Sequence, residues 1–203
     1  MSSCIASRAK ICLAAFGMLA IIAAARSPTI EQRMRQYISP DGSVRVEVSS
    51  VGKEPGLADY ESRIKFRTKD GKISCTLDFS SEDSDHGYGV VKAAWTRDSQ
   101  YFVFSLVSSG GHSPMHVPTQ FLSLKDGTVR SLDDYFAAGV VASPNFKIIA
   151  PHTVKVEVAG TDGKAWDAFV KLSSPRPLRA ASGSKPSLLE CTAGRVFKLG
   201  DEP

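Results

Sequence analysis

The sequence predicts an all-β protein, arranged as an antiparallel sandwich or as partial propeller-like sheets, with an N-terminal signal helix and one further short helix. Apolar and polar side chains alternate with a period of two in several runs, as they do in strands that bury one face. Asp-Gly turns separate some of these runs, which is typical of β-hairpins. The length of 203 residues and the apolar share of 42% fit a single globular domain.

The first 25 residues have the layout of a secretory signal peptide. Arg8 and Lys10 precede an unbroken apolar run over residues 11–25 that ends in small residues. This run is shorter than the roughly 20 apolar residues that a membrane-spanning helix needs. We therefore expect cleavage after Ala25 and export to the periplasm or to the cell exterior. In the alternative, an uncleaved N-terminus anchors the chain and is its one attachment to a membrane.

Export determines how the cysteines are interpreted. Cys4 and Cys12 would leave with the signal peptide, and the exported chain would keep Cys75 and Cys191. Disulfide bonds persist in oxidising compartments, so Cys75 and Cys191 are predicted to form one bridge. The alternative is a buried Cys75 thiol on the apolar face of its strand and an unpaired Cys191 near the tail.

The exported part begins with a segment that predicts a short helix over residues 26–37. Ser27 can cap this helix, and Pro28 suits its first turn. Residues 38–203 are expected to form one β-rich domain. Within this domain, residues 173–187 are rich in Pro, Ser and Gly and have no apolar period, which predicts a flexible surface loop.

Alternating residues predict the strands of this domain. The runs are "SVRVEVS" (43–49), "RIKFR" (63–67), "ISCTLDF" (73–79), the hairpin "TVKVEVAGTDGKAWDAFVKLS" (153–173) and "RVFKL" (195–199). The run "YFVFSLV" over residues 101–107 differs from them because both of its faces are apolar. We expect it to be a central strand that other elements cover on both sides.

Two stretches of the chain echo one another. "YISPDGSVRVEVS" (37–49) and "AAWTRDSQYFVFS" (93–105) each place a turn with an aspartate before an alternating strand. This pattern resembles the repeat of TolB-like and prolyl-oligopeptidase-type β-propellers, and the resemblance implies propeller-like sheets. Asp41 and Asp98 lie further apart than the roughly 40 to 50 residues of usual blades, and the chain is short for a closed ring. A sandwich or a partial propeller is therefore expected.

The charge of the chain argues against a nucleic-acid-binding protein. The formal charge is +4, and loss of Arg8 and Lys10 with the signal peptide leaves about +2. One local cluster stands out, because Arg63, Lys65, Arg67 and Lys69 share one face if their run is a strand. Such a row can meet phosphates or an anionic membrane surface. The simpler interpretation is a solvated face, or an edge strand that charge protects from pairing.

The loop over residues 108–120 is the candidate binding loop, because functional contacts concentrate on loops that rigid sheets hold in place. Its candidate contact residues are Ser109, Gly110, Gly111, His112 and His116. The glycines and prolines of this loop exclude a helix that would bring the two histidines together.

A metal site would need a second loop. The acidic loop over residues 80–89 offers Asp83, Asp85 and His86, which with His112 and His116 make a set of zinc-ligand types. A catalytic triad can also be written from Ser109, His112 and either Asp133 or Asp134, but a triad is defined by geometry rather than by spacing.

We therefore expect a non-catalytic exported module that binds an envelope or extracellular protein or a glycan, with no cofactor and no nucleic acid. The alternative is a small metal-assisted hydrolase that uses the histidine loop over residues 108–120 and the acidic loop over residues 80–89.

Overall fold

The computed structural model describes residues 34–51, 61–71, 74–83, 86–110, 116–172, 189–190 and 195–198. This part of the chain is almost entirely β-structure, and its strands form three sheets. The predicted all-β class is confirmed. Nothing in the described part is a helix of the length and apolar character needed to cross a bilayer.

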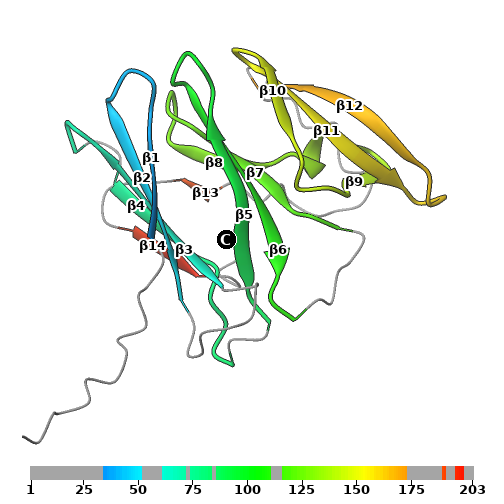
Figure 1. Cartoon of the computed structure of the whole chain (residues 1–203), viewed down its shortest axis with the longest axis horizontal. Coiled ribbons are helices and arrows are strands. Elements are labelled where there is room, and N and C mark those ends of the chain that lie inside the picture. Colours follow the sequence, from blue (N-terminus) through cyan, green and yellow to red (C-terminus); the bar gives the residue numbers. More distant parts are fainter. Residues whose placement is uncertain are drawn as a thin grey trace, which may run out of the picture. The chain divides into compact units, whose positions relative to one another are not determined.

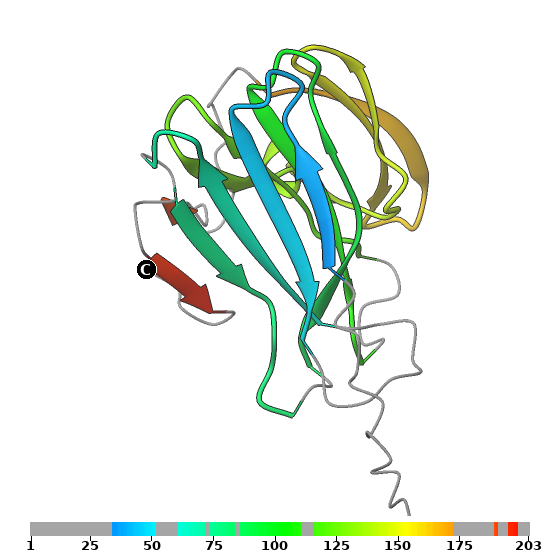
Figure 2. The same cartoon turned by 60° about the vertical axis from the view of Figure 1, so that its left-hand side comes forward.

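The first sheet has the strand order β1-β2-β3-β4-β14. Its strands are β1 (Met34–Ile38), β2 (Val44–Ser50), β3 (Ser62–Thr68), β4 (Ser74–Asp78) and β14 (Arg195–Lys198). The pairs are antiparallel except for β4 with β14, which run parallel with Arg195 opposite Cys75. Figure 2 shows β14, in red, beside β4.

The second sheet has the order β13-β8-β7-β6-β5, and all of its pairs are antiparallel. Its strands are β5 (Tyr88–Trp95), β6 (Tyr101–Ser108), β7 (Thr119–Ser123), β8 (Thr128–Ser131) and β13 (Leu189–Glu190). A single 3-10 turn (Asp133–Tyr135) follows β8.

The third sheet has the order β10-β11-β12, and β9 also pairs with β11. Its strands are β9 (Gly139–Val141), β10 (Lys147–Ala150), β11 (Thr153–Gly160) and β12 (Ala165–Lys171). Figure 1 shows the green strands of the second sheet between the other two sheets.

Strand β6 contributes to both cores. Phe102, Phe104 and Leu106 pack against the first sheet, while Tyr101 and Val103 pack against the third. These five side chains are at most 7% exposed. The prediction of a central strand covered on both sides is confirmed, since a strand that alternates between two apolar layers has no wet face.

Phe102 is the centre of an aromatic cluster in the first core. Its ring lies 5.5 Å from the ring of Tyr37, 5.7 Å from that of Phe66 and 5.0 Å from that of Trp95, measured between centroids. Edge-to-face and tilted aromatic contacts of this kind stabilise a core beyond the area that they bury.

The expected helix over residues 26–37 is wrong at its C-terminal end. Residues 34–37 belong to β1, where Tyr37 pairs with Val46 and packs on Phe102. Pairing with β2 and partial burial of the tyrosine ring outweigh the weak local preference for helix. Residues 26–33 lie outside the described residues, as do the signal peptide over residues 1–25 and the whole loop over residues 173–187.

The two stretches that echo one another form hairpin turns with the same hydrogen bonds. In the first turn, the Ser39 N–H donates to the Val44 carbonyl, the Gly42 N–H donates to the Ser39 carbonyl, and the Val44 N–H donates to the Ser39 hydroxyl. In the second turn, Thr96 makes the same three hydrogen bonds with Tyr101 and Ser99. The two turns lead into β2 and β6, which belong to different sheets. The two copies therefore share their turn geometry, and the propeller resemblance itself stays a prediction.

The predicted Asp-Gly hairpins are confirmed. Gly71 ends the turn between β3 and β4, and Gly163 ends the turn between β11 and β12. Both glycines have positive φ, +70° and +75°. Residues with a Cβ disfavour this conformation, so glycine suits the position.

Candidate functional site

The outer face of the first sheet carries the residues that alternate with its core. On β2, Val44 and Val46 point into the core, so Arg45 points away from it. On β3, Phe66 is buried and Lys65 and Arg67 are exposed. A basic face thus follows from the two-residue period of two adjacent strands.

The strand register arranges these side chains in lateral rows. In one row, Arg45 lies opposite Arg67, with Ile38 of β1 and Ser74 of β4 on either side. In the next row, Glu47 lies opposite Lys65, with Gln36 and Thr76 on either side. Side chains that are direct cross-strand partners lie about 5 Å apart at their Cβ atoms, so each row is a set of contacting neighbours.

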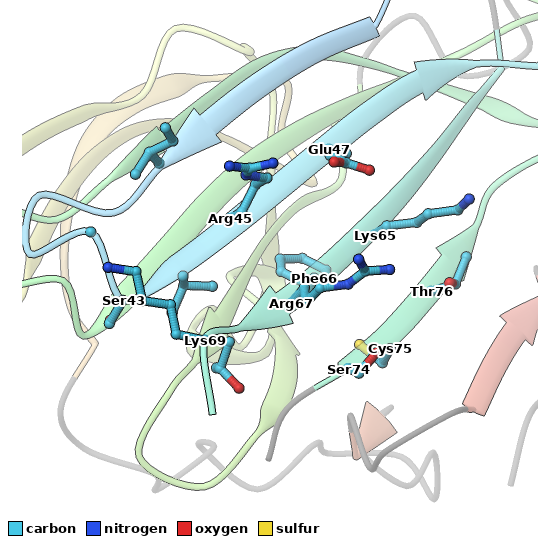
Figure 3. A pocket seen from close by; sticks show the side chains of 14 residues that line it. Ser43, Arg45, Glu47, Lys65, Phe66, Arg67, Lys69, Ser74, Cys75 and Thr76 are labelled. Carbon is cyan, nitrogen blue, oxygen red and sulfur yellow. The ribbon is translucent and has the colours of Figure 1, made fainter. Parts of the chain in front are cut away.

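Apart from Gln36, the residues of these rows line a hollow of about 470 Å³. Figure 3 shows Arg45 on β2 and Lys65 and Arg67 on β3 around it. Lys69 enters from the end of β3, where its backbone N–H donates to the Ser43 carbonyl at 2.9 Å. Ser43, Ser74 and Thr76 add hydroxyl groups to the lining. The hollow therefore offers cations and neutral hydrogen-bonding groups together.

The hollow has an excess of positive charge. Arg45, Lys65, Arg67 and Lys69 line it together with one carboxylate, that of Glu47. None of these four cations forms an ion pair with another described residue. Like charges directly opposite one another destabilise a sheet. An anion bound between Arg45 and Arg67 would remove this repulsion, and guanidinium groups suit carboxylate, sulfate and phosphate oxygens.

Arg63 is separate from the rest of the predicted cationic row. Its guanidinium donates to the buried carboxylate of Asp78 at 2.6 Å. Burial alone would raise the pKa of Asp78, but hydrogen bonds from Ser80 and Arg63 lower it below its usual value. Strand β3 pairs with β2 on one side and β4 on the other, so it is no edge strand. The row Arg63–Lys69 therefore divides into one structural ion pair and three side chains on the open face.

The bases of the two predicted functional loops meet at Glu61, a carboxylate that is 2% exposed. It accepts hydrogen bonds from the backbone N–H of Ser81 at 2.7 Å, from that of Gly87 at 2.7 Å and from the Ser109 hydroxyl at 3.0 Å. A Cβ on Gly87 would lie 2.4 Å from this carboxylate, so only glycine fits. Glu61 therefore holds the acidic loop and the histidine loop together at their bases.

Ser109, a candidate of the binding loop and of the triad, is part of this structural network. Its hydroxyl donates to Glu61, and its backbone N–H donates to the Gly87 carbonyl at 3.0 Å. Gly110 follows it at the end of the described part of the loop, and Gly111 and His112 lie outside the described residues. These hydrogen bonds to Glu61 and Gly87 are sufficient to position Ser109, so no histidine partner is needed to explain where it lies.

The histidines that the structure describes have separate carboxylate partners. His86 pairs with Asp83 within the acidic loop. His116 Nε2 lies 2.8 Å from Asp133 Oδ2, while Asp133 Oδ1 accepts the Val141 N–H at 2.7 Å. The hydrogen bond to Asp133 raises the pKa of His116, against the effect of burial.

The described residues contain no cluster of three or more metal-ligand side chains. Asp85 and His112, which the predicted metal set needs, lie outside the described residues. The metal site and the triad with Asp133 or Asp134 therefore stay predictions. Cys75 takes part in a disulfide bond. Since Cys191 lies outside the described residues, its pairing with Cys75 also stays a prediction.

Two important residues have no clear signal in the sequence. Arg45 belongs to an ordinary alternating run, and only the β2–β3 register shows that it faces Arg67. Glu61 directly precedes a strand, and its partners lie 20 to 48 residues away along the chain. No model of a known protein family matches the chain, and no curated protein matches it in sequence.

Proposed function

We propose that this chain is a non-catalytic binding module that holds an anionic glycan on the outer face of its first sheet. The observation that carries the proposal is the cross-strand pair of Arg45 and Arg67, with Lys65 beside it. The hollow that these side chains line contains a single carboxylate, that of Glu47. Two arginines on directly opposed positions, neither with a carboxylate partner among the described residues, form a site for the oxygens of a bound anion.

A polymer fits this face better than a small molecule does. The hollow lies on the outer face of the sheet. Its cations lie on adjacent strands, about 4.8 Å apart across the sheet, and at alternate residues, about 6.6 Å apart along a strand. A chain of charged sugars presents anionic groups at intervals and hydroxyl groups between them. Ser43, Ser74 and Thr76 can hydrogen-bond those hydroxyl groups.

The lining disfavours single-stranded nucleic acid as the ligand. Proteins of that class stack bases on exposed aromatic side chains. Among the described residues that line the hollow, the one aromatic residue is Phe66, which is 1% exposed. A ligand that needs charge and hydroxyl contacts, but no stacking, is the better match.

We further propose that the chain acts outside the cytoplasm. The apolar run over residues 11–25 would direct export, and an oxidising compartment would maintain a Cys75–Cys191 bridge. Arg195 of β14 lies opposite Cys75, and Cys191 is four residues earlier in the sequence. Such a bridge would tie the C-terminal segment to β4 at one side of the hollow. Envelope or extracellular glycans are the partners that this location provides.

Titration calorimetry with a uronic-acid polysaccharide and with a sulfated one tests the proposal. The double variant Arg45→Ser, Arg67→Ser should bind at least about tenfold more weakly, because each lost charge-assisted contact contributes roughly 1 kcal/mol or more. The control variant Lys155→Ser removes a cation from the third sheet, and its affinity should match that of the unmodified protein. Equal affinity in the double variant and the control, or no binding of either polysaccharide, would refute the proposal.

A further inference from the structure

Strand β12 has an edge that lacks a bulge and a proline, two of the features by which sheets avoid pairing with other chains. It pairs with β11 over seven consecutive residues without an irregularity, and it contains no proline. The edge strands β5 and β10 each carry a bulge, which hinders pairing. Within the described part of the chain, β11 is the one strand that pairs with β12.

The phase of the β11–β12 ladder shows which backbone groups point to this edge. The Gly160 N–H donates to the Lys164 carbonyl at one end, and the Leu172 N–H donates to the His152 carbonyl at the other. Hydrogen-bonded and non-hydrogen-bonded pairs alternate in an antiparallel ladder. The N–H and carbonyl groups that point away from β11 therefore belong to Ala165, Asp167, Phe169 and Lys171.

The side chains at this edge are more apolar than those of an ordinary wet face. Phe169 is 64% exposed on the outer face of the third sheet, and Trp166 is 44% exposed on the opposite face. Asp167 and Lys171 flank Phe169 at two residues on either side. The Asp167 carboxylate also pairs with Lys155 of β11 at 2.7 Å, and it stays 58% exposed. The edge thus presents an exposed aromatic ring between an acid and a base.

We propose that a second copy of this chain pairs its own β12 with this edge, antiparallel and with Phe169 opposite Phe169 on a two-fold axis. Two copies of the third sheet would then form one continuous sheet. An isologous contact of this kind needs a surface that is complementary to itself, and the sequence around Phe169 meets that condition. The inference does not depend on the proposed glycan site, which lies on another sheet.

Backbone geometry and charge together select the register. The groups at the free edge belong to odd-numbered residues, so odd-numbered residues must face one another. A pairing centred on Phe169 puts Asp167 opposite Lys171 twice. A pairing centred on Asp167 would oppose two carboxylates, and one centred on Ala168 would leave Asp167 opposite Phe169. The Phe169 register is the one that matches opposite charges.

Sedimentation velocity over a range of protein concentrations tests the interface. The unmodified protein should shift from monomer to dimer as the concentration rises. Phe169→Arg places two guanidinium groups opposite each other and should weaken the dimer by at least about tenfold. The control Ile149→Arg changes another exposed apolar residue of the third sheet, on β10, and should leave the dimer intact. A chain that is monomeric at every concentration would overturn the proposal.

Cysteine cross-linking tests the register separately. Opposed residues of a hydrogen-bonded pair have Cα atoms about 5.5 Å apart, within the range of a disulfide bond. Phe169→Cys should therefore give a covalent dimer on a non-reducing gel. Asp167→Cys should not, because the two copies of residue 167 would lie about four residues apart along the strands. Equal cross-linking of both variants, above the background of the unmodified protein, would show that the register is wrong.

Discussion

The backbone N–H of Asp41 donates a hydrogen bond to the side-chain hydroxyl of Ser99 at 3.0 Å, which joins the β1–β2 turn to the β5–β6 turn. Ser99 has φ of +61°, and Gly42, at the equivalent position of the other turn, has φ of +68°. Among the described residues, Ser99 is the one non-glycine residue with positive φ. Ser99 therefore adopts a backbone conformation that is unfavourable for serine, and its hydroxyl forms a hydrogen bond between the two sheets.

Replacement of Ser99 should separate these two effects. Ser99→Ala should lower the free energy of unfolding by about 1–2 kcal/mol, because the Asp41 N–H loses its acceptor and the positive φ remains. Ser99→Gly loses the same bond, but glycine adopts positive φ readily, so its cost should be smaller by about 1 kcal/mol. Urea denaturation of both variants measures the difference. A glycine variant less stable than the alanine variant would contradict this account.

Asp41 should make the fold sensitive to acid. The hydroxyl of Ser39, then the N–H and hydroxyl of Ser43, hold the pKa of Asp41 well below its usual value. A lowered pKa in the folded state contributes stability above the unfolded pKa of about 3.9, and that stability is lost as the pH falls through the folded value. Asp41→Asn should therefore show a shallower loss of stability below pH 4 than the unmodified protein does.

Thermal unfolding between pH 2 and pH 6 measures this slope. Asp162→Asn, which removes a carboxylate from the exposed β11–β12 turn, is the control for the loss of a turn aspartate. Identical slopes in Asp41→Asn and the unmodified protein would show that the hydrogen bonds of Asp41 do not contribute to acid stability.

Glu61 should be more important for stability than any single hydroxyl that it binds. Glu61→Gln replaces one acceptor oxygen by an amide that faces donors, so we expect a loss of about 2–4 kcal/mol. Ser109→Ala removes one donor and should cost about 1 kcal/mol. The double variant should cost less than the sum of the two, because both residues belong to one network. Urea denaturation of the three variants gives this coupling, and strict additivity would contradict it.

Local patterns predicted the strands well because a two-residue period needs no knowledge of distant residues. The alternation around Arg45 and the two apolar faces of residues 101–107 are visible within seven residues. The β1 strand was missed for the opposite reason. Its tyrosine packs on Phe102, 65 residues further along the chain, and no window around residues 34–37 contains that contact.

The candidate site was predicted only in part, because some of its contacts follow from local alternation and others join residues that are distant in the sequence. The cationic face of β3 follows from its alternation, whereas the Arg45–Arg67 pair depends on the β2–β3 register. Register is set by turns and by the core across two strands, so a single run does not contain it. The Glu61 network joins three separate segments, and a sequence read in order gives no indication that they meet.

His116 should make stability fall as the pH rises past neutrality. Its hydrogen bond to Asp133 raises its pKa, so the protonated histidine stabilises the fold below the unfolded pKa of about 6.5. This contribution is lost as the pH rises through the folded value. His116→Gln cannot titrate, and its stability should vary less between pH 6 and pH 8 than that of the unmodified protein. Thermal unfolding across this range measures the effect.

The control for this prediction is His86→Gln, in the exposed acidic loop. The His116–Asp133 pair also positions β9, because Asp133 accepts the Val141 N–H. A structural loss alone would therefore lower the stability of His116→Gln equally at every pH. A parallel displacement of the two curves would therefore assign His116 a purely structural role. Convergence of the curves at alkaline pH is the result that the raised pKa requires.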